Sequence, residues 1–388
     1  MPLRITIVTG FFLPVPAIGG GATERSWYGL ARIFAAAGHS VTFVSRDWAT
    51  QPPPESVAKL RHVRLRGFDH SRFLPVNLFL DLVWGLRVTT ALPRGDVVVC
   101  NTIFLPIWLS RIRGAAGKVA VMIGRAPKGQ VAFYDGVDRI YAPSSYVARE
   151  LDASDAEARV RVIGYPIDWP TLAQSARQKG KPVIIGFAGR IHPEKGIELL
   201  IRAAILLSNR RGIPEWRLRI VGPTAVSEGG GSEQWVADVR KASAALGDRV
   251  EWLPAEFAAE RLAALYGSMD VFCYPSLALK GETFGVAVAE AMAASCAVVV
   301  SSLGCFGDLV AHGETGLIFD HSSPDSDRLL SESLERLVAD PALRRAIATR
   351  GQQHVRRFDY AEVSTAVLQD LAFLAGAETE KRQHSVHV

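Results

Sequence analysis

Short apolar runs alternate with amphipathic segments along almost the whole chain. The runs predict a first series of strands at Arg4–Thr9, Ser40–Ser45, Val63–Arg66, Asp96–Cys100, Lys118–Met122, Arg139–Ala142 and Val160–Gly164. They predict a second series at Val183–Ala188, Arg217–Val221, Arg249–Leu253, Asp270–Tyr274, Ala297–Ser301 and Gly316–Phe319. Apolar strands separated by helices favour parallel sheets that are covered on both faces. The chain is therefore predicted to be α/β, with two doubly wound units.

The length and punctuation of the chain predict where these units begin and end. A chain of 388 residues favours two domains over one. The stretch from Pro166 to Pro182 is polar and rich in proline, so the join is expected there. We predict a first domain over residues 1–170, a second over residues 171–359, and a final helix over about 360–376.

Cysteine spacing and hydropathy predict the cellular compartment. The four cysteines, Cys100, Cys273, Cys296 and Cys305, form no Cys-x-x-Cys pair and are interpreted as reduced core residues. No run of about 18 apolar residues is present, so no membrane-spanning helix is expected. These features predict a cytoplasmic protein, with the inner face of the membrane as a further location.

Positive charge is concentrated in the first part of the chain. Residues 1–170 carry 20 basic and 13 acidic side chains, whereas the remainder carries 24 and 26. The densest basic cluster is Lys59, Arg61, Arg64, Arg66 and Arg72, and the apolar stretch Phe73–Leu80 follows it. This pattern suits peripheral contact with an anionic membrane or a lipid-linked acceptor. The alternative is a solvated strand edge followed by a core helix. No nucleic-acid motif is present, so nucleic acid is not expected as a partner.

The segment Gly281–Glu290 places two glutamates, Glu282 and Glu290, eight positions apart, with a Phe-Gly pair between them that can open a helix. A helix N-terminus presents free N–H groups and is a natural anion site. The alternative is two solvated surface charges, but the flanking runs are apolar and unpaired buried charges are costly. From Gly285 to Glu290 a helix rises about 7 Å. A retaining glycosidase holds its two carboxyl groups only about 5 Å apart, so the spacing argues against a hydrolase.

Two further loops follow predicted strands. Gly189 and Arg190 follow the predicted strand Val183–Ala188, and Lys195 lies five residues after Arg190. A guanidinium fork and an ammonium point charge suit a diphosphate, although a turn with incidental surface charge is the alternative. The segment Gly19–Gly21 follows the first strand and can bring backbone close to a phosphate or an acceptor. It is not a Gly-x-Gly-x-x-Gly fingerprint, which disfavours a dinucleotide oxidoreductase.

Four motifs together resemble those of retaining glycosyltransferase family 4, the glycosyl transferases group 1. They are Glu282-Thr283-Phe284-Gly285 with Glu290, the loop Gly189–Gly196, the hairpin His312–Leu317 and the glycines Gly19–Gly21. The resemblance extends from about residue 3 to about residue 370. It implies a GT-B fold, in which two Rossmann-like domains face one another across a cleft and the final helix returns to the first domain. It also implies metal-independent transfer of a sugar, with retention, from a nucleoside-diphosphate donor such as a UDP- or GDP-sugar to an acceptor hydroxyl.

The resemblance also assigns roles to individual residues. The expected catalytic residues are Arg190, Lys195 and Glu282. The expected donor-binding residues are Gly19, Gly20, Gly189, Thr283, Phe284, Gly285, Val286 and Glu290. The nucleotide base is expected near Leu253, Pro254 and Gly222. No metal and no cofactor are expected, because the nucleotide sugar is a substrate.

The chain departs from the family pattern after the fifth strand. Many members carry a histidine there, whereas this chain has Met122 and Ile123. The nearby Arg125 and Lys128 are therefore candidate contacts to the acceptor, with a solvated loop as the alternative. The acceptor is a glycan, a lipid-linked molecule or a small molecule. A sugar-nucleotide epimerase, a phosphorylase and a non-catalytic nucleotide-sugar-binding module remain as alternative functions.

Overall fold

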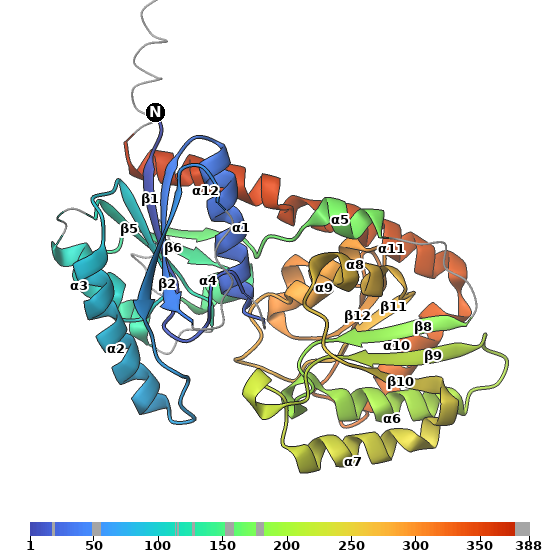
Figure 1. The fold of residues 1–388 in the computed structure, drawn as a ribbon. Coiled ribbons are helices and arrows are strands. Elements are labelled where there is room, and N and C mark those ends of the chain that lie inside the picture. The colour runs from blue at the N-terminus through green and yellow to red at the C-terminus, as the bar shows by residue number, and fades with distance from the viewer. Residues whose placement is uncertain are drawn as a thin grey trace, which may run out of the picture. The chain divides into compact units, whose positions relative to one another are not determined.

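The computed structural model describes residues 1–17, 20–48, 56–112, 114, 116–125, 129–151, 159–175 and 182–376. The chain forms two compact units (Figure 1). Unit 1 comprises Met1–Pro166 and the segment that begins at Tyr360, and unit 2 comprises Ile167–Asp359. Each unit is built on one parallel sheet, so the predicted α/β class with two doubly wound units is confirmed.

The sheet of unit 1 has seven strands in the order β3-β2-β1-β4-β5-β6-β7. The strands are β1 (Arg4–Val8), β2 (Ser40–Asp47), β3 (Leu60–Arg66), β4 (Val97–Cys100), β5 (Lys118–Met122), β6 (Arg139–Ala142) and β7 (Val160–Val162). All neighbouring strands pair in parallel, so the loops that follow the strands emerge at one edge. β3 begins three residues before the predicted start, because pairing of Val41 with Leu60 extends it through polar residues.

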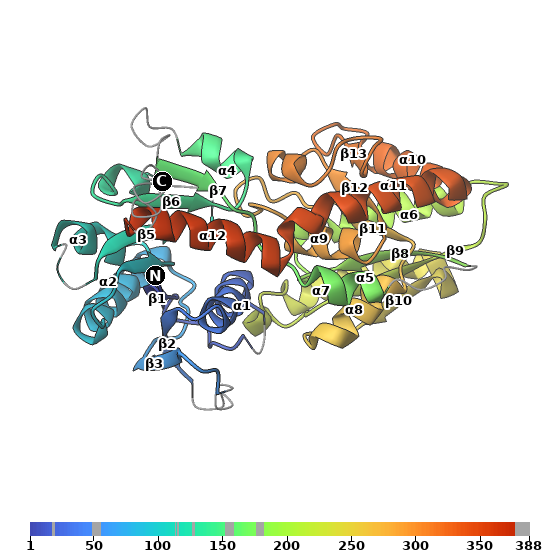
Figure 2. The ribbon, with the colours of Figure 1, turned by 90° about the horizontal axis from the view of Figure 1, so that it is seen from above.

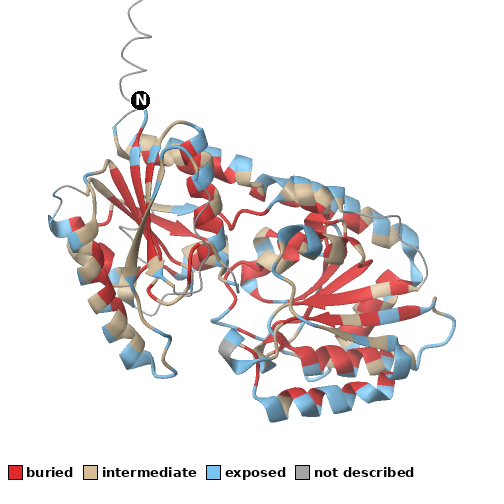
Figure 3. Cartoon of the chain, in the orientation of Figure 1, coloured by how far each residue is buried: buried red, intermediate tan, exposed pale blue. Residues whose placement is uncertain are grey.

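Helices cover both faces of this sheet (Figure 2). They are α1 (Ala22–Ala36), α2 (Leu74–Ala91), α3 (Leu105–Ile112), α4 (Ser145–Glu150) and α12 (Tyr360–Leu374). Trp84 of α2 and Leu105 of α3 share a core with Val8, Val44 and Val98, which all point to one face of the sheet. On the other face, Trp27 of α1 packs against Tyr141, and Tyr28 against Phe43. The central strands are almost fully buried, as Figure 3 shows.

The last helix, α12, is held to the sheet of unit 1 by Asp370. Its carboxylate accepts hydrogen bonds from Arg139 Nε and from the Tyr141 hydroxyl, each at 2.8 Å. The pKa of Tyr141 is raised far above its usual range, mainly by burial and secondly by the nearby Asp370 carboxylate. The Arg139 side chain is only 4% exposed, so Asp370 is the neutralising partner of a buried cation.

Helix α2 is anchored along one side only. Trp84 Nε1 donates to the carbonyl of Thr9, and Asp81 accepts from the backbone N–H groups of Ile103 and Phe104. Burial raises the pKa of Asp81 to about 6, and its two backbone hydrogen bonds oppose this shift. The opposite side of α2 is also apolar but exposed, with Phe79, Leu82 and Leu86 at the surface. No helix in the described ranges is long and apolar enough to cross a bilayer.

The sheet of unit 2 has six parallel strands in the order β10-β9-β8-β11-β12-β13. The strands are β8 (Val183–Ala188), β9 (Trp216–Val221), β10 (Val250–Leu253), β11 (Val271–Tyr274), β12 (Ala297–Ser301) and β13 (Leu317–Phe319). Its helices are α5 (Trp169–Gln174), α6 (Ile197–Ser208), α7 (Glu233–Ser243), α8 (Ala259–Gly267), α9 (Val286–Ala293), α10 (Ser326–Ala339) and α11 (Pro341–Val355). In both units the strand order reverses beside the first strand of the sheet, next to β1 and next to β8. Such a switch point is where open α/β sheets bind ligands.

We expect Asp370→Ala to lower the free energy of unfolding by about 3 kcal/mol, because buried Arg139 would lose this ion pair and the Tyr141 hydroxyl would lose its acceptor. Urea unfolding followed by tryptophan fluorescence measures the change. The matched control is Glu362→Ala, an exposed carboxylate on the same helix, which should change stability by less than about 0.5 kcal/mol. Equal stabilities of the two variants would contradict the anchoring role of Asp370.

Candidate functional site

In unit 2, the polar residues singled out in the sequence lie in loops that follow β8 and β11 and at the start of α9. β8 and β11 are neighbours in the sheet, so their carboxyl ends lie side by side at its switch point. Parallel pairing therefore brings together segments that are about 90 residues apart in the sequence.

The direct contact between these loops is a buried ion pair. Lys195 Nζ donates to Glu282 Oε2 at 2.7 Å, and the two side chains are 7% and 11% exposed. The hydroxyl of Ser276, which follows β11, donates to the same carboxylate oxygen at 3.1 Å. Ser276 is itself held in place, because its carbonyl accepts from the Ser301 hydroxyl. The pair is thus satisfied by hydrogen bonds, which a buried pair requires for stability.

An aromatic cluster lies beneath this ion pair. Lys195 Nζ is 5.4 Å from the centre of the Tyr274 ring, which stacks on Phe187 and on Phe272. Burial, with a further contribution from Glu282, raises the pKa of Tyr274. Burial acts to lower the pKa of Lys195, but Tyr274 and Glu282 outweigh it, and the net pKa is raised. Lys195 is therefore a permanent cation in a largely dry environment.

Gly285 turns the chain from this loop into α9. It is the residue before the first helical turn, with φ of 94° and ψ of 57° in the left-handed region. A Cβ atom at this position would meet the Phe306 ring at 2.6 Å, so both conformation and space require glycine. Thr283 and Phe284 are buried before it, and Val286 opens the helix, whose first N–H groups have no intrahelical partner.

Glu290 lies on the second turn of α9 and is 8% exposed. Its Oε2 accepts a hydrogen bond from the Tyr266 hydroxyl at 3.1 Å. The Tyr266 ring meets Phe272 edge-on, and Phe272 stacks on Tyr274. The aromatic cluster therefore supports both acidic residues of the site, Glu290 through Tyr266 and Glu282 through Tyr274.

Arg190 is the exposed cation of the site. Its guanidinium donates to the carbonyl of Gly229 at 3.1 Å and to Glu194 at 2.5 Å, and its side chain is 44% exposed. Gly189, which precedes it, lies against Gly222 at the end of β9. A Cβ atom on Gly222 would meet the Gly189 carbonyl oxygen at 1.8 Å, so Gly222 has a packing role, and its place near the base stays a prediction.

The structure adds residues that sequence reasoning missed. These residues are Ser276, Tyr274 and Tyr266, which contact Glu282, Lys195 and Glu290 respectively. In the sequence, each is marked only by its polar group at or just beyond the end of an apolar strand or helix. His312 has a structural role, because its Nδ1 accepts from the backbone of Ile318 and closes the hairpin. Leu253 ends β10, and Pro254 follows it at the same edge.

The candidate residues of unit 1 fall partly within the described residues. Gly20 and Gly21 have positive φ, and Gly21 precedes α1. Arg125 is exposed. Burial raises the pKa of Glu24, and the positive charge of Arg125 acts in the opposite direction. Met122 and Ile123 are buried where the family histidine was expected. Gly19 and Lys128 lie outside the described residues.

One Asp-x-Asp triplet, Asp325-Ser326-Asp327, occurs at the start of α10. Both carboxylates have arginine partners, Arg328 for Asp325 and Arg202 for Asp327. Within the described ranges, no group of three or more His, Cys, Asp or Glu residues has the arrangement of a metal site.

We expect Gly285→Ala to destabilise unit 2 by about 1–3 kcal/mol, since it combines a positive φ with a clash against Phe306. Thermal or urea unfolding measures the loss. Gly307→Ala is the matched control because nothing lies within 4 Å of the place that its new methyl group would occupy, and it should stay within about 0.5 kcal/mol of wild type. A variant at Gly285 as stable as the one at Gly307 would contradict this account of the turn.

Comparison with known proteins finds similarity to unit 2 at the level of sequence. Residues 170–354 match the family model described as glycosyl transferases group 1. The D-inositol 3-phosphate glycosyltransferase of Pseudarthrobacter chlorophenolicus is 32% identical over 244 residues, which cover 59% of this chain and 55% of that protein. The chain spans about half the length of the curated relatives it matches.

Solved structures resemble the chain along nearly its whole length. Sucrose-phosphate synthase of Thermosynechococcus elongatus superposes with a TM-score of 0.76 at 20% identity, covering 96% of this chain and 99% of that one. HepE of Anabaena, solved with UDP-glucose, superposes with a TM-score of 0.70 at 17% identity, covering 95% and 99%. These likenesses show the GT-B fold. Residues 170–354, which make up most of unit 2, thus resemble the glycosyl transferases group 1 family.

Proposed function

We propose that this protein transfers a sugar from a nucleoside-diphosphate donor to an acceptor hydroxyl, with retention of configuration and without a metal. The observation that carries the proposal is the buried Lys195–Glu282 pair at the switch point of unit 2, inside the segment that matches the family model. HepE, which shares the fold, was solved with UDP-glucose, and this supports a nucleotide sugar as the donor.

The chemistry of this transfer needs positive charge at the leaving group. When the glycosidic bond of the donor breaks, the departing nucleoside diphosphate gains negative charge. Lys195 is buried and stays protonated, and Arg190 and the N–H groups at the start of α9 lie in neighbouring loops. Fixed donors in a site with little water stabilise developing charge strongly. These groups supply the stabilisation that a metal ion provides in other enzymes.

Glutamates suit the hydroxyl-rich ends of such a donor. A carboxylate offers only acceptors, so it pairs well with the hydroxyl groups of a sugar. Glu282 is assigned to the donor sugar and Glu290 to the ribose, as the family resemblance implies. The ion pair with Lys195 holds the Glu282 carboxylate in one orientation before any ligand binds.

We expect Lys195→Ala and Arg190→Ala each to weaken UDP binding by about tenfold and to slow sugar transfer by about a hundredfold or more. Titration calorimetry measures binding, and UDP release in the presence of candidate acceptors measures transfer. Lys241→Ala, an exposed lysine on α7 of the same unit, is the matched control and should leave both unchanged. Circular dichroism serves as the control that the variants are folded.

Several outcomes separate this proposal from its alternatives. Near-normal binding and transfer in both variants would reject the assigned site. A thermal-shift screen with UDP, GDP, ADP and TDP identifies the base, because a bound nucleotide raises the apparent stability. A sugar-nucleotide epimerase would convert its substrate without any acceptor, and a phosphorylase would require inorganic phosphate. Tight nucleotide binding with no transfer to any acceptor would favour a non-catalytic module.

The proposal extends to peripheral contact between unit 1 and an anionic membrane. Phe79, Leu82 and Leu86 form an exposed stripe along α2, at positions i, i+3 and i+7, and are 63%, 36% and 55% exposed. Phe73 and Leu74 extend this surface at the start of the helix. Large exposed apolar patches mark interaction surfaces, and nearby basic residues favour an anionic bilayer. Basic residues occur on α2 itself (Arg87), just before it (Arg72) and on β3 (Arg61, Arg64 and Arg66).

We expect the protein to sediment with vesicles of phosphatidylcholine and about one-third phosphatidylglycerol, and to be released as salt screens the charges. Phe79→Ser should reduce the bound fraction several-fold because it removes apolar area from the contact. Phe373→Ser is the matched control, since Phe373 is also 63% exposed and lies on α12 of the same unit. Equal binding by the two variants would contradict a contact through α2.

A further inference from the structure

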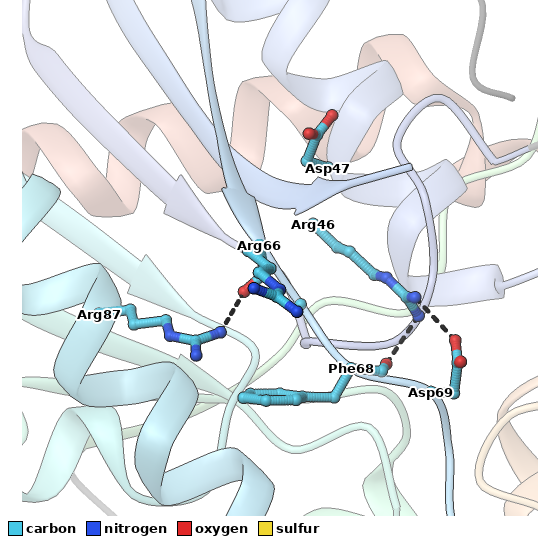
Figure 4. A pocket seen from close by; sticks show the side chains of 7 residues that line it. Arg46, Asp47, Arg66, Phe68, Asp69 and Arg87 are labelled. Atoms are coloured by element: carbon cyan, nitrogen blue, oxygen red, sulfur yellow. Dashed lines mark hydrogen bonds and ion pairs between the residues drawn. The ribbon is translucent and has the colours of Figure 1, made fainter. Parts of the chain in front are cut away.

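A pocket of about 560 Å³ lies in unit 1, at the carboxyl ends of β2 and β3 (Figure 4). It is lined by Arg46, Asp47, Arg66, Gly67, Phe68, Asp69 and Arg87. Its volume is within the range of small-molecule sites. None of these residues belongs to the motifs that identify the family, so the role of the pocket is a separate question.

Arg46 builds one wall of the pocket and is electrically neutralised there. Its guanidinium donates to the carbonyls of Phe12 at 3.0 Å and Phe68 at 2.6 Å, and it pairs with Asp69 at 2.7 Å. A Cβ atom on Gly67 would meet the Phe11 carbonyl oxygen at 2.3 Å, so the loop after β3 lies tightly against the preceding segment. The wall is therefore fixed by the fold before any ligand arrives.

Arg66 and Arg87 supply positive charge that no carboxylate of the pocket neutralises. Arg87 lies over the Phe68 ring, 4.6 Å from its centre, and donates to the backbone carbonyl of Arg66. Within the described part of the chain, the Arg66 guanidinium has no hydrogen-bond or ion-pair partner. Asp69 is engaged with Arg46, and Asp47 points away from the arginines (Figure 4). Two like charges at one pocket repel one another, and a bound anion relieves this repulsion.

We propose that this pocket binds a phosphate group on the acceptor of the transfer reaction. Guanidinium groups bind phosphate oxygens through paired N–H donors, and the Phe68 ring fixes the position of the Arg87 guanidinium. The pocket opens at the edge of the unit 1 sheet where loops follow the strands, which is the edge that binds ligands in such sheets. The inference rests on the proposed transferase function, because it names a chemical class for the acceptor.

Two kinds of acceptor carry such a phosphate group: a soluble phosphorylated molecule and a lipid with a phosphate headgroup. The first arm of the test titrates the full-length protein with sn-glycerol 3-phosphate, with glycerol as the neutral control. The second measures co-sedimentation with phosphatidylcholine vesicles that contain phosphatidic acid, in excess of binding to phosphatidylglycerol vesicles of matched charge, which the contact through α2 also binds. Binding in the first arm assigns a soluble source, and binding confined to the second assigns a lipid.

We expect Arg66→Ala to weaken phosphate binding about tenfold in whichever arm shows it, since one charged hydrogen-bonding group is lost. Arg66→Lys should recover part of the affinity, because it restores the charge without the fork. Arg149→Ala is the matched control, an exposed arginine on α4 beside β7, at the opposite edge of the sheet. It should bind like wild type.

The affinity for UDP separates this inference from the proposed function. Arg66→Ala should bind UDP like wild type, since Arg66 is outside the candidate donor site. Loss of phosphate binding with intact UDP binding supports the pocket. Equal phosphate binding by Arg66→Ala and Arg149→Ala, or no binding by wild type in either arm, overturns the pocket and leaves the donor site unaffected.

Discussion

The buried ion pair between Lys195 and Glu282 is the interaction on which the candidate site depends. It joins two residues that are 87 positions apart, and it does so across the ends of neighbouring strands. Removing either partner would leave a buried charge without compensation, which is strongly destabilising. The loop after β8, the loop after β11 and the entry to α9 are therefore held in one arrangement by the contact on which the proposed function rests.

Much of the fold followed from local patterns. β5, β6, β8 and β12 agree with their predicted bounds because each is an apolar run closed by a clear break. Helix α7 ends at Ser243, and 3-10 turns that are interrupted by a non-helical conformation at Gly247 continue to Arg249. Strand order brings the loops of Lys195 and Glu282 together, so the sequence predicts that these residues lie near one another. It does not predict that their side chains form an ion pair.

Other features depend on contacts that a linear pattern does not contain. Nothing near Ser276 or Tyr266 in the sequence indicates that their hydroxyl groups bind Glu282 and Glu290. The arginine pocket likewise combines β2, β3 and α2, and only the packed structure shows that Arg46 is neutralised while Arg66 is not. Helix α2 was foreseen either as a core helix or as a membrane contact, and the structure shows an apolar helix with one side buried and the other exposed.

The two basic residues of the candidate donor site differ in how they can respond to a diphosphate. Lys195 and Glu282 form a nearly dry, hydrogen-bonded pair, so separating them is costly. Arg190 pairs with Glu194 near the surface, where side chains are 44% and 33% exposed and an ion pair contributes little. Under the proposed function, a diphosphate would replace Glu194 on Arg190 at small cost, whereas Lys195 would keep its carboxylate and add bonds through its remaining ammonium protons. Lys195 and Glu282 would then be the preorganised part of the site, and Arg190 the part that rearranges onto the ligand.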